Sequence, residues 1–259
     1  MVSVRDLCVG YSLDNVLLNQ LSFDIREGEI FAIMGPSGCG KTTLFRHLIG
    51  LTKPLSGNLT VLNHDLLDRS RNTLIEVRKK IGVAFQQGAL INSLSLIDNV
   101  ELPLREHTRL DKMTMRIMSR MKLEMMGLLD AESLMPAQLS GGMLKRAGLA
   151  RAVVMDPKIL FFDEPSAGLD PATSAELDDL ILQLRDLLKI TVVIITHDLD
   201  SAIKIADRVL VLGDGGIAAL GDVEVLKSST SKTVQALLNR RASRARLTGD
   251  DYIEQLTHE

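Results

Sequence analysis

Hydrophobic and polar positions alternate through the first part of the chain. Up to about residue 28, apolar residues such as Val2, Val4 and Leu7 recur at every second or third position, which predicts antiparallel strands. Short apolar runs follow at 30–34, 81–85, 159–162, 192–195 and 209–212. Each run has the length of a strand, and helical patterns separate most of them. They therefore predict a largely parallel sheet that is buried on both faces, with a hairpin turn after the last run.

The segment 104–135 differs from this pattern because it is rich in methionine. Six of the eleven methionines fall between Met113 and Met126. Apolar residues repeat there at helical spacing, at Ile117, Met121, Met125 and Leu128. The main interpretation is packing within a small helical subdomain. The alternative is an adaptable contact surface, a known use of methionine.

The pattern divides the chain into an α/β domain, 1–226, and a polar C-terminal tail, 227–259. We expect the helical subdomain to span about 88–156. The tail ends with arginines and then acidic residues: Arg240, Arg241, Arg244, Arg246, Asp250, Asp251 and Glu254. It is either a solvated end or an arm that folds on a partner, such as a second protomer.

Composition limits the function classes. The net charge of −3 and the 3% of aromatic residues, without tryptophan, argue against nucleic acid as a partner. No apolar run approaches the roughly 20 residues that span a bilayer, and no secretory signal pattern is present. Two cysteines, Cys8 and Cys39, are too few for a disulfide framework. We expect a soluble protein of a reducing compartment that reaches a membrane only through a partner.

The clearest chemical motif lies at residues 35–43. It fits G-x-x-x-x-G-K-[ST] between a predicted strand and a predicted helix, and reads Gly35, Pro36, Ser37, Gly38, Cys39, Gly40, Lys41, Thr42 and Thr43. The glycines expose backbone N–H groups to phosphates, Lys41 brings positive charge to the β- and γ-phosphates, and Thr42 offers a hydroxyl to Mg²⁺. The thiol of Cys39 is either reactive in these surroundings or merely fills space.

A second motif is an apolar strand that ends in two carboxylates. Asp163 can hold Mg²⁺, and the adjacent Glu164 can orient and deprotonate an attacking water. Such a pair alone is often a solvated turn. Together with the phosphate-binding motif, it predicts hydrolysis of a nucleoside triphosphate.

Three single residues are further candidates. A lone histidine is more often structural, but His197 follows a predicted strand, and a strand end beside a phosphate site suits a hydrogen bond to a γ-phosphate. Gln86 ends another strand and can reach Mg²⁺ or the water. Tyr11 either stacks on adenine or is a partly exposed edge aromatic, and the sequence supports both equally.

The stretch Ser140, Gly141, Gly142 opens a predicted helix and has two explanations. Ser140 can cap the helix while the glycines allow close packing, or the exposed N–H groups can bind an anion. One chain that holds one nucleotide does not need a second anion site. If two chains face each other, Ser140 and Gly142 of one can cap the γ-phosphate held by the other.

Taken in order, these motifs resemble the ATPase subunit of an ABC transporter. They are Tyr11, the 35–43 loop, Gln86, LSGGM at 139–143, FFDE at 161–164, SAGLD at 166–170 and His197. The resemblance covers about residues 2–222. It implies an α/β P-loop NTPase fold of ABC ATPase type, with a mainly parallel sheet core, N-terminal antiparallel strands and a helical subdomain. It also implies ATP and Mg²⁺ as cofactors and a homodimer that sandwiches ATP, with the SAGLD loop crossing the interface near Asp170. Met143 departs from the usual glutamine, which leaves the details of the contact in trans open.

Within the family, the sequence resembles those of the ATPases of Mla-type (MCE) phospholipid transport systems. The resemblance lies in residues 85–108, in LSGGMLKR and in FFDEPSAGLDP. This implies a membrane permease that contacts the loop after Gln86, at Ala89, Leu90, Ile91 and Leu94. A small STAS-domain regulatory protein and an MCE-type lipid-binding protein are further implied partners. The implied location is the cytoplasmic face of the bacterial inner membrane.

Three alternatives remain. One is an ABC importer or exporter ATPase for another solute. Another is a soluble ABC-type ATPase acting on DNA or ribosomes, which the single phosphate-binding motif and the short span from Gln86 to Ser140 disfavour. The third is a nucleotide-switched binding protein without turnover, which the presence of Glu164 disfavours.

Overall fold

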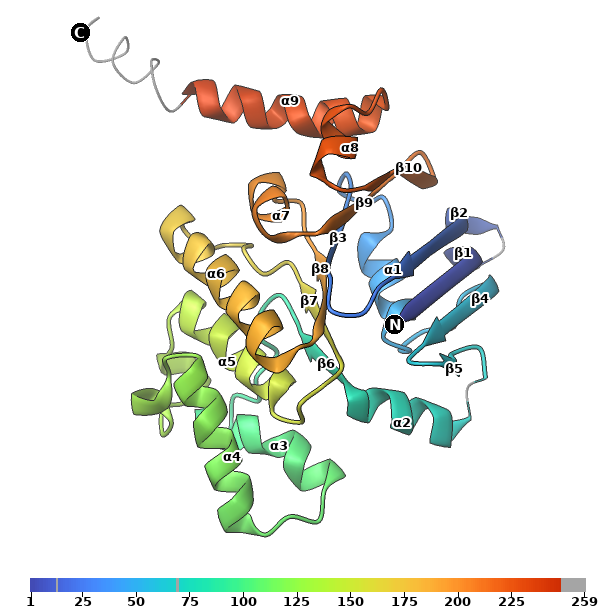
Figure 1. Cartoon of the computed structure of the whole chain (residues 1–259). Helices are drawn as coiled ribbons and strands as arrows, with labels where there is room; N and C mark the ends of the chain where they lie inside the picture. Colours follow the sequence, from blue (N-terminus) through green and yellow to red (C-terminus); the bar gives the residue numbers. More distant parts are fainter. Residues whose placement is uncertain (13, 69, 248–259) are drawn as a thin grey trace, which may run out of the picture.

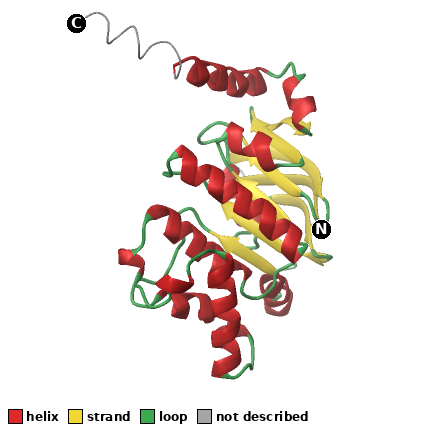
Figure 2. Cartoon of the chain, turned by 60° about the vertical axis from the view of Figure 1, so that its left-hand side comes forward, coloured by secondary structure: helices red, strands yellow, loops and turns green. Residues whose placement is uncertain are grey.

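The computed structural model describes residues 1–12, 14–68 and 70–247, and for residues 240–247 it describes the backbone only. These residues form two sheets covered by helices, as Figure 1 and Figure 2 show. The strands are β1 Val2–Ser12, β2 Asn15–Ile25, β3 Ile30–Met34, β4 Ser56–Val61, β5 His64–Asp65, β6 Ile81–Ala84, β7 Ile159–Asp163, β8 Thr191–Ile195, β9 Arg208–Gly213 and β10 Gly216–Gly221. The helices are α1 Lys41–Leu48, α2 Arg71–Lys80, α3 Leu96–His107, α4 Lys112–Met125, α5 Gly141–Val153, α6 Pro171–Leu188, α7 Leu199–Ile205, α8 Val223–Lys227 and α9 Lys232–Leu247. Short 3₁₀ helices lie at Leu129–Ala131 and Pro136–Gln138.

The smaller sheet contains the predicted N-terminal strands. Its order is β2-β1-β4-β5, and every pair in it is antiparallel. Val4 lies opposite Phe23, and Leu7 opposite Leu21, so the alternating apolar residues share one buried face. The prediction of antiparallel strands is confirmed.

The larger sheet has the order β10-β9-β3-β8-β7-β6. The strands from β9 to β6 are parallel, and β10 returns antiparallel to β9 through the turn at Asp214 and Gly215. All five apolar runs are therefore strands of one sheet, and the hairpin lies where the sequence places it.

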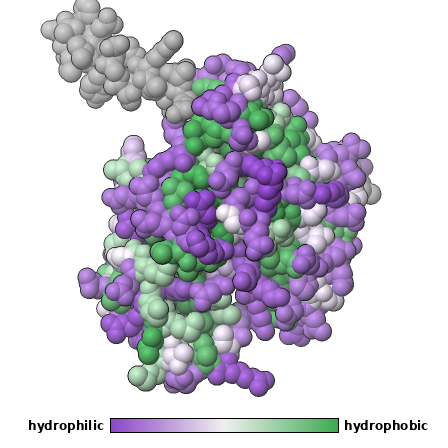
Figure 3. Space-filling view, in the orientation of Figure 1, coloured by the Kyte–Doolittle hydropathy of each residue, from purple (hydrophilic) through white to green (hydrophobic). Residues whose placement is uncertain are grey.

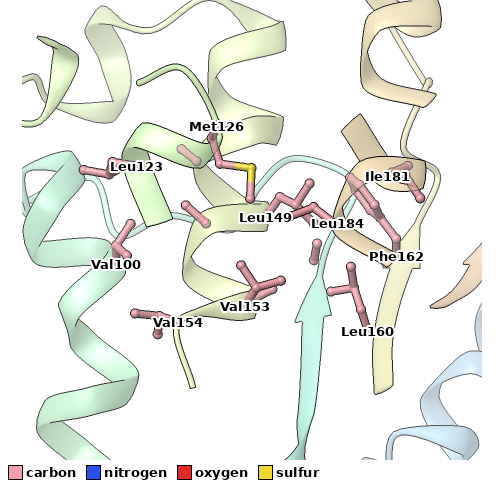
Figure 4. Packing of buried hydrophobic residues seen from close by; sticks show 14 of the residues in the cluster. Val100, Leu123, Met126, Leu149, Val153, Val154, Leu160, Phe162, Ile181 and Leu184 are labelled. Atoms are coloured by element: carbon pink, nitrogen blue, oxygen red, sulfur yellow. The ribbon is translucent and has the colours of Figure 1, made fainter. Parts of the chain in front are cut away.

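Both faces of this sheet are buried, which explains why its strands are continuous apolar runs. In β7, Leu160 and Phe162 join the core beneath α3, α5 and α6, whereas Ile159 and Phe161 join the core around α1. Successive side chains of a strand point to opposite faces, so a strand covered on both sides needs no polar positions. Figure 4 shows Phe162 of β7 in one cluster with Leu149 of α5 and with Ile181 and Leu184 of α6.

The methionine-rich helix α4 presents a different face from the one predicted. Ile117 and Met121 are 51% and 58% exposed, and Met113 is 74% exposed. The helix instead buries Met115 and Leu123 against α3 and α5. The predicted packing face is thus wrong at two of its positions, since the sequence of one helix does not say on which side its neighbours lie. Figure 3 shows hydrophobic surface at the lower left, where Figure 1 places α4.

Helices α8 and α9 follow the last strand. Val234 of α9 is only 2% exposed, and Leu237 and Leu238 pack against the same small core as Met34 of β3. The first half of α9 therefore docks on the body, while the division at residue 227 stays a prediction. Residues 248–259, which include the acidic end of the predicted tail at Asp250, Asp251 and Glu254, lie outside the described residues. In the part of the chain that the structure describes, no helix is long and apolar enough to cross a membrane.

Candidate nucleotide site

The candidate residues gather at one edge of the larger sheet. Strands β3, β8, β7 and β6 are neighbours and run parallel, so their carboxyl ends lie at the same edge. The loop 35–43 follows β3, His197 follows β8, Asp163 and Glu164 end β7, and Gln86 follows β6. In open α/β sheets ligands bind at this edge.

The phosphate-binding loop has a backbone that side chains would obstruct. Gly35, Gly38 and Gly40 have φ values of 152°, 80° and 101°. A Cβ atom on Gly35 would lie 2.6 Å from the carbonyl oxygen of Leu212. Helix α1 then begins at Lys41 with no side-chain cap and no acidic residue in its first turn. Its first N–H groups therefore remain available to an anion.

Lys41 is held inside this loop. Its side chain is buried, and Nζ donates to the carbonyl oxygens of Gly35 at 2.8 Å and of Pro36 at 3.0 Å. The adjacent Thr42 is exposed, so its hydroxyl is accessible to a metal ion. Cys39 packs partly buried against the core around α1. The loop thus combines a fixed positive charge with open backbone donors, which suits a nucleotide phosphate chain.

The acidic pair favours a cation. Burial raises the pKa of the Asp163 carboxyl, and the neighbouring charge of Glu164 raises it further, against the opposing charges of Arg46, Lys41 and Lys145. A bound cation would stabilise the ionised form. No group of three or more His, Cys, Asp or Glu side chains suited to a metal occurs among the described residues. Mg²⁺ needs no such cage because it keeps waters and phosphate oxygens as ligands, so Thr42 and Asp163 fit it.

Glu164 has an unusual backbone and is held from several sides. Its φ is +50°, in the left-handed region that residues with a Cβ seldom adopt. Its N–H donates to the carbonyl oxygen of Ile195 in β8 at 2.8 Å. One carboxylate oxygen lies 2.7 Å from Nδ1 of His197. Two of the predicted catalytic side chains, Glu164 and His197, are therefore in direct contact.

The start of α5 shows the predicted cap. Ser140 precedes the helix, and its hydroxyl accepts a hydrogen bond from the N–H of Met143 at 3.3 Å. A Cβ on Gly142 would lie 2.9 Å from the Cγ2 methyl of Thr173, so this glycine allows α5 to approach α6 closely. The capping explanation is confirmed. Ser140 and Gly141 are also exposed, and their role toward an anion stays a prediction.

The helix starts at Lys41 and Gly141 belong to different layers. Phe45 of α1 packs with Phe161, whereas Leu149 of α5 packs with Phe162 on the other face of the sheet. Tyr11 lies apart from both at the end of β1 and is 69% exposed. Its ring is accessible for stacking, which is compatible with both interpretations.

Two basic residues near the site were not predicted. Lys145 of α5 is only 5% exposed and donates to the carbonyl oxygen of Glu164 at 2.9 Å. The guanidinium of Arg151 donates to the carbonyl oxygens of Gly88 at 2.9 Å and of Ala89 at 2.8 Å. Arg151 thereby fastens the loop after Gln86 to α5. These partners are backbone carbonyls far away in sequence, so no motif could indicate them.

An open cavity of about 680 Å³ lies between this loop and the start of α5. Gln86, Leu90, Leu144, Lys145 and Leu169 are among its lining residues. Ala89 also lines the cavity, and Ile91, two positions further along the chain, is 41% exposed. The apolar residues predicted to contact a partner are thus accessible in part.

These features define a nucleotide-binding P-loop protein with a capped Ser-Gly-Gly helix start, and comparison places it in a family. The family model described as ABC transporter matches residues 18–167. The chain belongs to this family and is an ABC transporter ATPase.

Its relatives narrow the class. It is 39% identical to the intermembrane phospholipid transport system ATP-binding protein MlaF of Haemophilus influenzae, over 94% of this chain and 93% of that protein. It is 40% identical to the MlaF of Escherichia coli K12, over 92% of this chain and 88% of that protein. A probable ribonucleotide transport ATP-binding protein of Mycobacterium leprae is also 40% identical, over 85% of this chain and 64% of that protein.

Solved structures agree with the fold. A dimeric ATP-binding cassette in a post-hydrolysis state, bound to ADP and Pi, superposes with a TM-score of 0.79 at 33% identity, over 86% of this chain and 99% of that one. The cbiO1 subunit of a Clostridium perfringens ABC transporter complex has a TM-score of 0.80 at 32% identity, over 94% and 96% of the two chains. The predicted P-loop NTPase fold of ABC type is confirmed.

Proposed function

We propose that this ATPase powers phospholipid transport between the membranes of a bacterial envelope. The observation that carries the proposal is the similarity to two phospholipid transport ATP-binding proteins over more than nine-tenths of the chain. The motifs of this chain serve ATP hydrolysis, so we assign the selection of the cargo to a membrane permease and its partners.

The proposed roles in hydrolysis follow from the site. Lys41 and the backbone N–H groups of 35–43 bind the β- and γ-phosphates, and Tyr11 stacks on adenine. Thr42, Asp163 and Gln86 hold Mg²⁺, which when bound neutralises phosphate charge. Glu164 orients and deprotonates the attacking water, and His197 contacts the γ-phosphate.

ABC cassettes work as dimers with membrane permeases, and we propose a sandwich in which each site is completed by the partner. Support comes from the two helix starts on opposite faces of the sheet, only one of which follows the phosphate-binding loop. Ser140, Gly141 and Gly142 of one protomer would then cap the γ-phosphate held by the other. Asp170 caps α6 by accepting from the N–H of Thr173, whose methyl group lies against Gly142, so the fold brings it near this surface.

The remaining partners are proposed in the same way. The loop from Gln86 to Leu94, fastened to α5 by Arg151, is the proposed permease contact. The chain would lie at the cytoplasmic face of the inner membrane through that permease. An MCE-type lipid-binding protein and a small STAS-domain protein are proposed members of the same assembly, and residues 240–259 a proposed contact within it.

The test disables the motor in cells and examines the envelope. Lys41→Ala removes the phosphate-binding charge, and Lys53→Ala at an exposed lysine is the matched control. We expect surface-exposed phospholipid and detergent sensitivity with the first variant only, while uptake of small solutes continues. An intact outer membrane together with lost uptake of a solute would contradict the lipid assignment. The similarity to the probable ribonucleotide transport protein makes ribonucleotides the first solute to test.

A further inference from the structure

Lys145 connects the helix that begins at Ser140 with the backbone of Glu164. Its Nζ donates to the carbonyl oxygen of Glu164 at 2.9 Å, and the side chain is only 5% exposed. It stands five residues after Ser140 on the same helix. A lysine buried in this way gives up hydration, which is costly unless its ammonium group is well placed toward acceptors or negative charge.

The backbone conformation of Glu164, the residue that Lys145 contacts, depends on its neighbours. The left-handed φ of Glu164, +50°, is strained for a residue with a Cβ and persists only where neighbouring groups fix it. Strand β8 fixes the N–H, and His197 contacts the carboxylate. The carbonyl receives the ammonium of Lys145 and, at 3.3 Å, the N–H of Ala167. Each side of the residue is thus held by a different element.

From this geometry we infer that Lys145 is a positioning residue for ATP hydrolysis. Through its hydrogen bond to the carbonyl of Glu164, Lys145 makes the placement of the Glu164 carboxylate depend on the position of α5. The inference rests on the proposed role of Glu164 as the base. It goes further because it couples the helix start that would face the partner's nucleotide to the chemistry in its own site. A shift of α5 moves the ammonium, and with it the turn that carries Glu164. A displacement of about 1 Å at a catalytic group can cost 10²-fold in rate.

The variant Lys145→Met tests this because methionine keeps much of the apolar stem and removes the donor and the charge. In this variant the carbonyl of Glu164 still accepts a hydrogen bond from the N–H of Ala167, so it is not left without a partner. We expect kcat for ATP to fall at least tenfold while KM changes less than threefold. Lys145→Arg, which keeps a cationic donor, should recover a substantial part of kcat.

The matched control is Lys122→Met. Lys122 is also a buried lysine of the same region, 9% exposed, but it donates to Asp156 at 2.6 Å rather than to the site. We expect this variant to lower the melting temperature and leave kcat unchanged. Equal losses of kcat in both lysine variants would assign Lys145 a merely structural role and overturn the inference.

A double variant shows whether Lys145 acts through Glu164. If it does, adding Lys145→Met to Glu164→Gln should not lower the rate of single-turnover hydrolysis further. The effects of substitutions on the rate are not additive when the residues act through each other. The double variant should still dimerise with ATP, as we expect of Glu164→Gln. An additional tenfold loss, or loss of the dimer, would overturn the inference. Normal turnover by Glu164→Gln alone would instead refute the proposed base, and the inference with it.

Discussion

Nδ1 of His197 lies 2.7 Å from a carboxylate oxygen of Glu164. An ionised carboxylate can only accept, so Nδ1 must carry the proton. The ring is 59% exposed and Glu164 is 15% exposed, which leaves Nε2 at the open side of the pair. Nε2 can donate to a γ-phosphate when both ring nitrogens carry a proton. The proposed base and the proposed phosphate contact therefore act as one unit.

The first prediction concerns the base. Glu164→Gln keeps size and polarity but removes basicity, so steady-state phosphate release should fall by about 10²- to 10⁴-fold while ATP still binds. ATP should then hold the variant as a dimer in size-exclusion chromatography. Hydrolysis at a near-normal rate would remove Glu164 from this role.

The second prediction concerns the histidine. His197→Ala removes both the phosphate contact and the partner of Glu164, so kcat should fall by about 10²-fold. Because the two residues act together, the double variant with Glu164→Gln should lose little more than Glu164→Gln alone. Initial rates over a range of ATP concentrations measure this. Multiplicative losses would show that the two side chains act independently.

The third prediction tests the sandwich. Ser140→Arg places a bulky charge at the start of α5, so hydrolysis should be abolished while nucleotide binding to the monomer is spared. Lys41→Ala cannot bind the phosphates productively. A mixture of the two variants forms dimers in which one site has both halves intact, and some activity should return. Mixed dimers without any activity would argue against completion of the site in trans.

The fourth prediction concerns pH and stability. His47 of α1 is 2% exposed, and burial lowers its pKa from 6.5, against the opposing hydrogen bond with the carbonyl of Thr52. Between that lowered pKa and 6.5 the unfolded chain binds a proton that the folded chain does not. The stability that His47 contributes is therefore fully present above pH 6.5 and is lost as the pH falls through the pKa of the folded state. Its limiting slope is about 1.4 kcal/mol per pH unit.

His47→Gln removes the titrating group and should flatten this part of the stability curve. Guanidinium unfolding of both proteins from pH 5 to pH 8 measures the difference in the free energy of unfolding. Parallel curves for the two proteins across that range would contradict the assignment.

The fifth prediction concerns Cys39. A Cβ on Gly35 would lie 2.7 Å from its sulfur, so the thiol is enclosed by the loop that holds the phosphates. Alkylation adds bulk there and should abolish hydrolysis, with ATP protecting against the reaction. Cys39→Ala should be insensitive to the reagent, and Cys8 provides the internal comparison in that variant. Full activity of a chain shown by mass spectrometry to be modified at Cys39 would disprove the prediction.

Features that depend on neighbouring residues in the chain could be predicted from the sequence. Strands buried on both faces must be apolar throughout, so β3, β7, β8 and β9 are visible as runs. The phosphate-binding loop is legible because its glycines, Lys41 and Thr42 are contiguous. Ser140 is legible as a cap because its acceptor and the N–H of Met143 are three residues apart.

Only the tertiary structure decided which faces and charges meet. The exposure of Ile117 and Met121 depends on where α3 and α5 lie around α4. The hydrophobic periodicity of one helix does not indicate where its neighbours lie. Lys145 reaches Glu164 across 19 positions of sequence, and its acceptor is a backbone carbonyl that every residue has. The sequence by itself thus determined the fold class, and it predicted the residues that contact nucleotide. Packing decided the geometry among them, because contacts between distant segments depend on how helices and sheet are assembled.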